Sequence, residues 1–308
     1  MEAAPPATAA ETWGGREGVW GRPVGSFTNG CESDYALTRL VGEPFNTLAA
    51  LAIVGIGLFG LYHCAPPGHE LRTRATYLAL ALLGAGAALF HVTLLEFTEL
   101  FHGLPVVYAA CVLLFSVLTS QREPPFKATE SQVPATRRAH YSPLPTREES
   151  TDSSVAVLPQ LVLCLAVYAG ISTLAPILLD FDELVPLVPM FAGIALAALA
   201  LQSWRAYSEH QPILDEAGAA ALGKASLGIF ALALVFWLVE TQYCTTIAVW
   251  NFHALWHVLE GVAGYLLCVF LSACRAISLG WDVNILYWRS VVPVIVIDRD
   301  PVSYSMEF

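Results

Sequence analysis

Three histidines in this sequence have types and spacing that could hold a metal ion. His253 and His257 are four residues apart, so both imidazoles would lie on the same face of a helix. This spacing is a common way for one helix to offer two nitrogen ligands. His91 lies near the end of another apolar segment and could supply a third ligand, and three protein ligands with an open position are typical of catalytic zinc. The alternative is that these histidines are hydrogen-bonded packing residues within a helical bundle.

Two further polar residues lie near these histidines in the chain. Glu260 follows His257 by three residues, so its carboxylate could accept the free ring N–H of a ligand histidine. The simpler interpretation, which we favour, is that Glu260 pairs with another polar group in the bundle. His102 follows His91 by eleven residues and could act as a base or as a fourth ligand. A fourth ligand would close the open position and favour a structural metal site.

An acidic segment precedes the first long apolar run. Glu32, Asp34 and Glu43 lie close together in the sequence, with Asn29 nearby. Clustered oxygen ligands suit Ca²⁺, so this segment is a candidate calcium site. A solvated acidic loop without a metal would have the same composition.

Membrane helices must position these residues. The chain has 308 residues, of which 56% are hydrophobic and only 13% charged, whereas soluble domains carry about 25% charged residues. About 20 apolar residues are needed to span a bilayer as a helix, so we expect an all-α fold, a seven-transmembrane helix bundle. The expected helices are 44–63, 75–95, 100–120, 156–179, 184–204, 222–242 and 249–275. The apolar run 285–297 is broken by Arg289 and Pro293, so we assign it to the tail.

The positions of Lys and Arg predict the orientation of the bundle. If the N-terminus lies outside, twelve of the 15 Lys and Arg residues fall on the inner side, as the positive-inside rule requires. We therefore expect three regions: a lumenal or extracellular N-terminal segment (1–43), the membrane domain (44–275) and a cytoplasmic tail (276–308). Residues 121–155 are rich in Pro, Ser, Thr and Glu, which predicts a disordered cytoplasmic loop.

In this orientation, the candidate functional residues lie on the outer side of the membrane. The four histidines named above all fall at or near the outer leaflet, where buried polar groups are costly and usually functional. Cys31 and Cys244 also fall on the outer side. A disulfide between them is expected if that side is an oxidising compartment.

Composition and pattern exclude several functions. A net charge of −11 argues against nucleic acid as a partner. A retinal protein would need a lysine in its last helix, and the two lysines, Lys127 and Lys224, lie elsewhere. A transporter is a poor match because the sequence shows no repeated halves.

Five short motifs across residues 29–275 resemble one family when taken in order. They are C-E-x-D-Y from Cys31, E-P-F-N-T from Glu43, F-H-V-T-L from Phe90, L-P-x-x-Y from Leu104 and F-H-A-L-W-H from Phe252. Together they resemble the alkaline ceramidase family, part of a superfamily of seven-helix lipid hydrolases. The resemblance implies hydrolysis of the amide bond of ceramide or a related N-acyl sphingolipid, giving a sphingoid base and a fatty acid. It also implies a membrane of the endoplasmic reticulum or Golgi.

The resemblance further implies two metal sites and a disulfide. His91, His253 and His257 would hold zinc. The calcium ligands would be Glu32, Asp34 and Glu43, with help from Asn29 and Gly30. Cys31 and Cys244 match the disulfide positions of the family.

The sequence departs from the family at residues that matter for catalysis. Ala87 replaces a serine that would stabilise the oxyanion, and His102 replaces an aspartate that would act as base or orient the water. Loss of both the serine and the aspartate predicts weaker amide hydrolysis, unless His102 serves as the base. Asn29-Gly30 replaces Asp-Trp, which removes one carboxylate from the calcium site. The alternative function is therefore a catalytically impaired relative, a lipid-binding or receptor-like membrane protein that keeps the metal as a structural element.

Overall fold

Seven long helices build the part of the fold that the structure describes. The computed structural model describes residues 17–21, 23, 31–64, 70–120, 151–178 and 187–298. Within these residues the long helices are α2 (Pro44–His63), α3 (Leu71–Thr93), α4 (Glu96–Ser120), α6 (Thr151–Leu178), α8 (Leu187–Glu216), α9 (Ala219–Ile247) and α10 (Phe252–Ser278). The short 3₁₀ turn η2 (Ala248–Trp250) joins the last two. All seven are long and apolar enough to cross a bilayer, so the protein is a multi-pass integral membrane protein, and the predicted all-α seven-helix bundle is confirmed.

The helix bounds differ from the sequence prediction mainly at polar ends. Helix α2 has the predicted bounds, whereas α8 continues to Glu216, twelve residues past the predicted end. Helix α6 begins at Thr151, inside the segment 121–155 that we expected to be disordered; the rest of that segment, 121–150, lies outside the described residues. The physical reason is that hydropathy marks the part of a helix that lies in lipid, and backbone hydrogen bonding continues beyond it.

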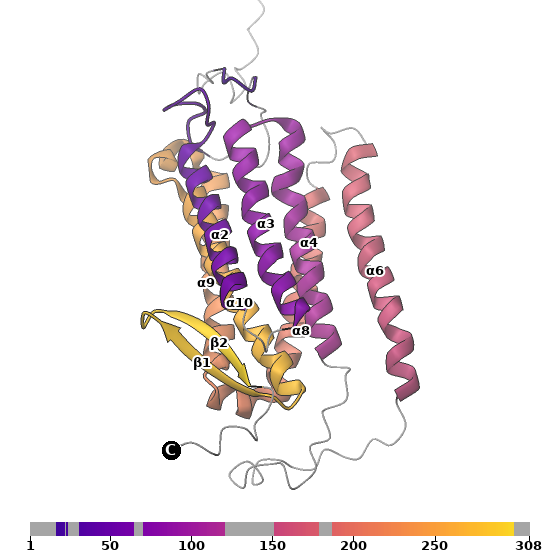
Figure 1. Ribbon diagram of the computed structural model, residues 1–308. Helices are drawn as coiled ribbons and strands as arrows, with labels where there is room; N and C mark the ends of the chain where they lie inside the picture. The colour runs from indigo at the N-terminus through magenta and orange to yellow at the C-terminus, as the bar shows by residue number, and fades with distance from the viewer. Residues whose placement is uncertain are drawn as a thin grey trace, which may run out of the picture.

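The last helix packs through the middle of the bundle, against α2, α3, α4, α8 and α9, as Figure 1 shows. Close approach of α3 to its neighbours depends on glycine. A Cβ at Gly84 would lie 2.7 Å from the carbonyl oxygen of Ala50 in α2, and one at Gly86 would lie 1.9 Å from that of Phe101 in α4. Small residues at such crossings let membrane helices pack closely, and here Gly84 allows α3 to approach α2 while Gly86 allows it to approach α4.

The segment 31–43 covers one end of the bundle (Figure 1). Gly42 and Glu43 donate backbone hydrogen bonds of 2.9 Å to the carbonyl oxygens of Val92 and His91. The buried Tyr35 donates a 2.6 Å hydrogen bond to the carbonyl oxygen of Thr93. These contacts fix Glu43 directly beside the C-terminal turn of α3. We refer to this end as the covered end; its assignment to the lumen stays a prediction.

A β-hairpin lies near the opposite end of the bundle, where the sequence predicted only a tail. Strands β1 (Asp282–Trp288) and β2 (Val292–Asp298) pair antiparallel, with Ile285 opposite Ile295. The prediction missed the hairpin because Arg289 and Pro293 interrupt the apolar run. Arg289 instead forms the turn, with a φ of 49°, and Pro293 belongs to β2.

Candidate metal centre

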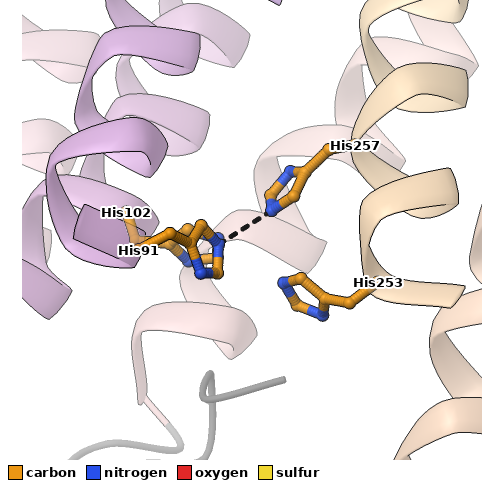
Figure 2. A group of neighbouring side chains, drawn as sticks. All are labelled: His91, His102, His253 and His257. Atoms are coloured by element: carbon orange, nitrogen blue, oxygen red, sulfur yellow. Dashed lines mark hydrogen bonds between the residues drawn. The ribbon is translucent and has the colours of Figure 1, made fainter. Parts of the chain in front are cut away.

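Four histidines from three helices meet near the covered end of the bundle. Their ligand nitrogens all lie within 4.8 Å of one another, and Figure 2 shows the rings pointing toward a common centre. The members of this histidine cluster are His91 of α3, His102 of α4, and His253 and His257 of α10. Three are buried, and His102 is partly buried. The sequence-predicted ligands are therefore brought together, and His102 joins them.

Glu43 orients the first histidine of the cluster. Its Oε2 lies 2.5 Å from Nδ1 of His91, and both side chains are fully buried. The other ring nitrogen, Nε2, lies 3.0 Å from Nε2 of His257. Two ligands of a tetrahedral zinc lie about 3.3 Å apart when Zn–N distances are about 2.0 Å. A carboxylate on the outer nitrogen of a histidine is a common support for metal ligation, so the two Nε2 atoms are suitably placed for one ion.

Each of the two α10 histidines has a buried ring nitrogen that makes no hydrogen bond to the described residues. Among the described residues, neither Nε2 of His253 nor Nδ1 of His257 makes a hydrogen bond, although both atoms are buried. Glu260 approaches the second of these, with Oε2 at 3.6 Å from Nδ1 of His257. A buried polar atom without a partner is costly. Binding of a cation at Nε2 of His253 would remove that cost, so the donor set fits a metal ion.

Two of the predicted calcium ligands have other partners in the structure. The carboxylate of Glu32 accepts backbone hydrogen bonds of 2.9 Å from Phe45 and from Asn46, at the first turn of α2. Burial is the main cause that raises the pKa of Glu32 to about 7, although these two bonds act in the opposite direction. Glu43, as described, contacts His91. Asp34 is partly buried in the same segment.

Asn29 and Gly30, the remaining predicted calcium ligands, lie outside the described residues. The calcium site therefore stays a prediction.

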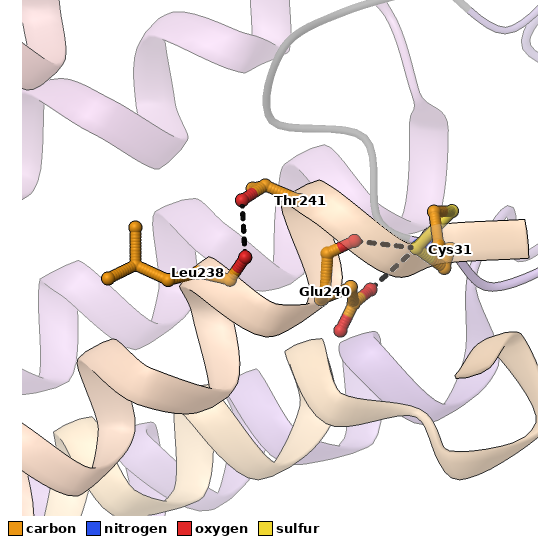
Figure 3. Close-up of a disulfide and its surroundings, with 5 residues drawn as sticks. Cys31, Leu238, Glu240 and Thr241 are labelled. Atoms are coloured by element: carbon orange, nitrogen blue, oxygen red, sulfur yellow. Dashed lines mark hydrogen bonds between the residues drawn. A yellow bond between two sulfur atoms is a disulfide. The ribbon is translucent and has the colours of Figure 1, made fainter. Parts of the chain in front are cut away.

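A disulfide and a carboxylate tie the segment 31–43 to α9. Cys31 and Cys244 are joined by a disulfide, and Oε1 of Glu240 accepts a 2.8 Å hydrogen bond from the backbone N–H of Cys31 (Figure 3). Sequence reasoning overlooked Glu240, although it is an acidic residue inside a predicted membrane helix. Such residues are rare and usually functional, and this signal would have identified it.

A cavity opens beside the histidine cluster. It has a volume of about 240 Å³, and His102 and His253 form part of its wall together with Glu99 and Glu260. The rest of the lining is mostly apolar and comes from α4, α6, α8, α9 and α10. An apolar ligand in this cavity would therefore meet polar groups where the cavity reaches the histidines.

Ala87 lies one turn before His91 on α3 and is buried. It packs in a small cluster with Ala50 and Ala88. Its methyl group offers no hydrogen-bond donor, so the side chain of Ala87 cannot stabilise an oxyanion.

Comparison with known proteins places the chain in a family. The ceramidase family model matches residues 22–296. Alkaline ceramidase 3 of Mus musculus is 25% identical over 295 residues, which cover 92% of this chain and 96% of the relative. Putative alkaline ceramidase dcd3B of Dictyostelium discoideum is 26% identical over 277 residues (83% and 88%). Alkaline ceramidase of Arabidopsis thaliana is 22% identical over 289 residues (92% and 97%). Because the family model covers most of its 308 residues, the chain belongs to the ceramidase family.

Proposed function

We propose that this protein is a zinc-dependent amidase that hydrolyses ceramide or a related N-acyl sphingolipid to a sphingoid base and a fatty acid. The observation that carries the proposal is the convergence of four imidazoles beside a largely apolar cavity. The family membership supports the same reaction. We further propose that the protein works in the endoplasmic reticulum or Golgi, with the covered end in the lumen.

His91, His253 and His257 would hold the zinc. Zinc bound by three histidines supplies Lewis-acid activation of water and of a carbonyl group. Glu43 holds the ring of His91 through Nδ1, which directs Nε2 into the cluster. The buried Nε2 of His253, which makes no hydrogen bond among the described residues, supports this assignment.

The apolar cavity would take a hydrocarbon chain of the lipid, with the amide beside His102 and His253, which form part of the cavity wall. In hydrolysis, the oxygen of water bonds to the amide carbon, the C–N bond breaks, and the nitrogen leaves with a proton. In this proposal, His102 would accept the proton from the attacking water and return it to the leaving nitrogen. The methyl group of Ala87 contributes nothing to this exchange.

Calcium is the second metal in the proposal, held by the segment 29–43. The candidate ligands are Glu32, Asp34, Glu43, Asn29 and Gly30. Burial raises the pKa of Glu32, and repulsion from Glu43 adds to the shift, so a cation between these carboxylates would favour their ionised forms. Removal of calcium with a chelator should lower the melting temperature of the purified protein, and an unchanged melting temperature would contradict this part of the proposal.

The test of the amidase is direct. The purified protein, loaded with zinc in lipid vesicles, is supplied with ceramides of several chain lengths, and released sphingoid base is measured. We expect release by the wild type, loss of zinc and activity in His253→Ala, and retention of both in the control His210→Ala, since His210 lies outside the cluster. Absence of release from the zinc-loaded wild type would overturn the proposed activity.

A second function, a catalytically impaired relative that binds lipid, is favoured by one observation. The ligand nitrogen of His102 lies within the cluster, where a fourth ligand would close the open position needed for catalysis. The double variant Ala87→Ser, His102→Asp separates the two functions. Hydrolysis that appears only in this variant would identify an impaired scaffold. Hydrolysis by the wild type that is lost in His102→Ala, with zinc retained, would identify His102 as the base.

A further inference from the structure

The β-hairpin of β1 and β2 has one face packed on the bundle. Val283 and Ile295 are buried and belong to the main hydrophobic core. Tyr265 of α10 donates a 2.7 Å hydrogen bond to the carbonyl oxygen of Pro293. The hairpin is therefore held firmly against α10, and its position relative to the helices is defined.

The other face of the hairpin is apolar over the part that lies toward the turn. Side chains alternate between the two faces of a strand, so Leu286 and its cross-strand partner Val294 lie on the outer face, next to the pair of Asn284 and Val296. Leu286 is 58% exposed and Val296 is 42% exposed. The outer face of an antiparallel hairpin in water is usually polar. By the same alternation, Asp282 at the open end of the hairpin and the pair of Trp288 and Val292 at its turn end share this face. The middle and the turn end of the face are therefore mostly apolar and suited to an apolar environment.

The hairpin lies where the membrane span of α2 ends. The ring of Trp288 is 5.3 Å from that of Phe59, one turn before the end of α2 at His63. Tyr62 in the same turn is 75% exposed. In Figure 1 the hairpin extends sideways from the bundle near this end of α2. The lipid-facing surface of α2 therefore continues onto the hairpin.

The turn of the hairpin combines aromatic, apolar and cationic groups. Val291 is 75% exposed, Tyr287 is 54% exposed, and the guanidinium of Arg289 lies 4.8 Å from the ring centre of Trp288. Aromatic rings with nearby Arg are enriched at the membrane–water boundary. The free edges of a two-stranded hairpin exclude it from the hydrocarbon core, because their backbone groups would have no partners there.

We propose that the outer face and turn of the hairpin rest in the lipid headgroup layer of the bilayer that the bundle spans. The occupant of this face is the bilayer itself, because the face continues the lipid-facing surface of α2 and carries a cation beside aromatic rings. The proposal is independent of the amidase activity.

Spin-label accessibility in lipid vesicles tests this placement. Of the seven cysteines, two form the disulfide and only Cys164 of the other five is exposed, so Cys164→Ala provides a background with no exposed thiol. Labels are attached to Leu286→Cys and to Val296→Cys. The controls are Leu58→Cys, on the exposed surface of α2, and Asp215→Cys, at an exposed charged position of α8.

We expect the two hairpin labels to show a ratio of oxygen to water-soluble nickel chelate accessibility severalfold above that of the Asp215 label and below that of the Leu58 label. A ratio equal to that of the Asp215 label would place the hairpin in water and overturn the proposal. Low accessibility to both reagents would show a protein partner or a second copy on this face, and would overturn it as well. Circular dichroism of each labelled variant establishes that the helices are retained.

Discussion

The contact between Glu43 and His91 makes a graded prediction about zinc affinity. Glu43→Gln keeps an oxygen that can accept from Nδ1 of His91 but removes the charge, whereas Glu43→Ala removes both. Loss of a group that supports a metal ligand typically costs tenfold to 100-fold in affinity, or about 1.4–2.7 kcal/mol. Both side chains are fully buried and 2.5 Å apart, so water cannot replace the carboxylate. We expect zinc affinity to fall about tenfold in Glu43→Gln and about 100-fold in Glu43→Ala.

The measurement is a competition between the purified protein and a fluorescent zinc chelator. The matched control is Glu96→Gln, which removes an exposed acidic group near the covered end of the bundle and should leave the affinity unchanged. If both Glu43 variants bind zinc as tightly as the wild type, the carboxylate does not support a ligand, and the reasoning from the Glu43–His91 contact is wrong. An equal loss in the Glu96 control would attribute the effect to net charge instead.

Three further predictions concern packing, the disulfide and the cavity. Gly86→Ala should destabilise the protein by about 1–3 kcal/mol, because its Cβ would meet an α4 carbonyl at 1.9 Å; Gly170→Ala, with open space around it, should leave the melting temperature unchanged. Cys244→Ser should lower the free energy of unfolding by about 2–4 kcal/mol, since Cys31 loses its disulfide partner. The melting temperatures measured with and without reductant should then coincide for the variant and differ for the wild type. Gly193→Phe places a ring in the cavity and should reduce hydrolysis of long-chain ceramides more than that of short-chain ceramides, with zinc content unchanged. The control Gly170→Phe should alter neither the hydrolysis nor the zinc content. An equal loss for all chain lengths would show that the cavity does not hold the chain.

The helices were predictable because the bilayer imposes a simple requirement. A run of about 20 apolar residues has few alternatives to a spanning helix, and Pro44, allowed at the first turn of a helix, marks the start of α2 where the structure has it. The hairpin was not predictable by this criterion. It lies at the edge of the bundle, where a 13-residue run broken by Arg289 and Pro293 can satisfy its backbone by strand pairing instead.

The histidine cluster was predictable in its members but not in its supports. The spacing of His253 and His257 reflects a local rule of helix geometry. The contact of Glu43 with His91 joins residues 48 positions apart, and that of Glu240 with Cys31 joins residues 209 positions apart. No local pattern encodes such contacts, because they depend on how the helices pack. The role given to Glu43 from the sequence was therefore limited to calcium.

The disulfide has a consequence for the order in which the protein matures. Cys31 and Cys244 are separated by 213 positions, so the ribosome must complete six of the seven described spans before the bond can form. Until then, no disulfide links the segment 31–43 to α9, and the last helix with two of the four imidazoles is still to be inserted. If the cluster binds the proposed zinc, all of its histidines can hold the ion only after this last helix is inserted.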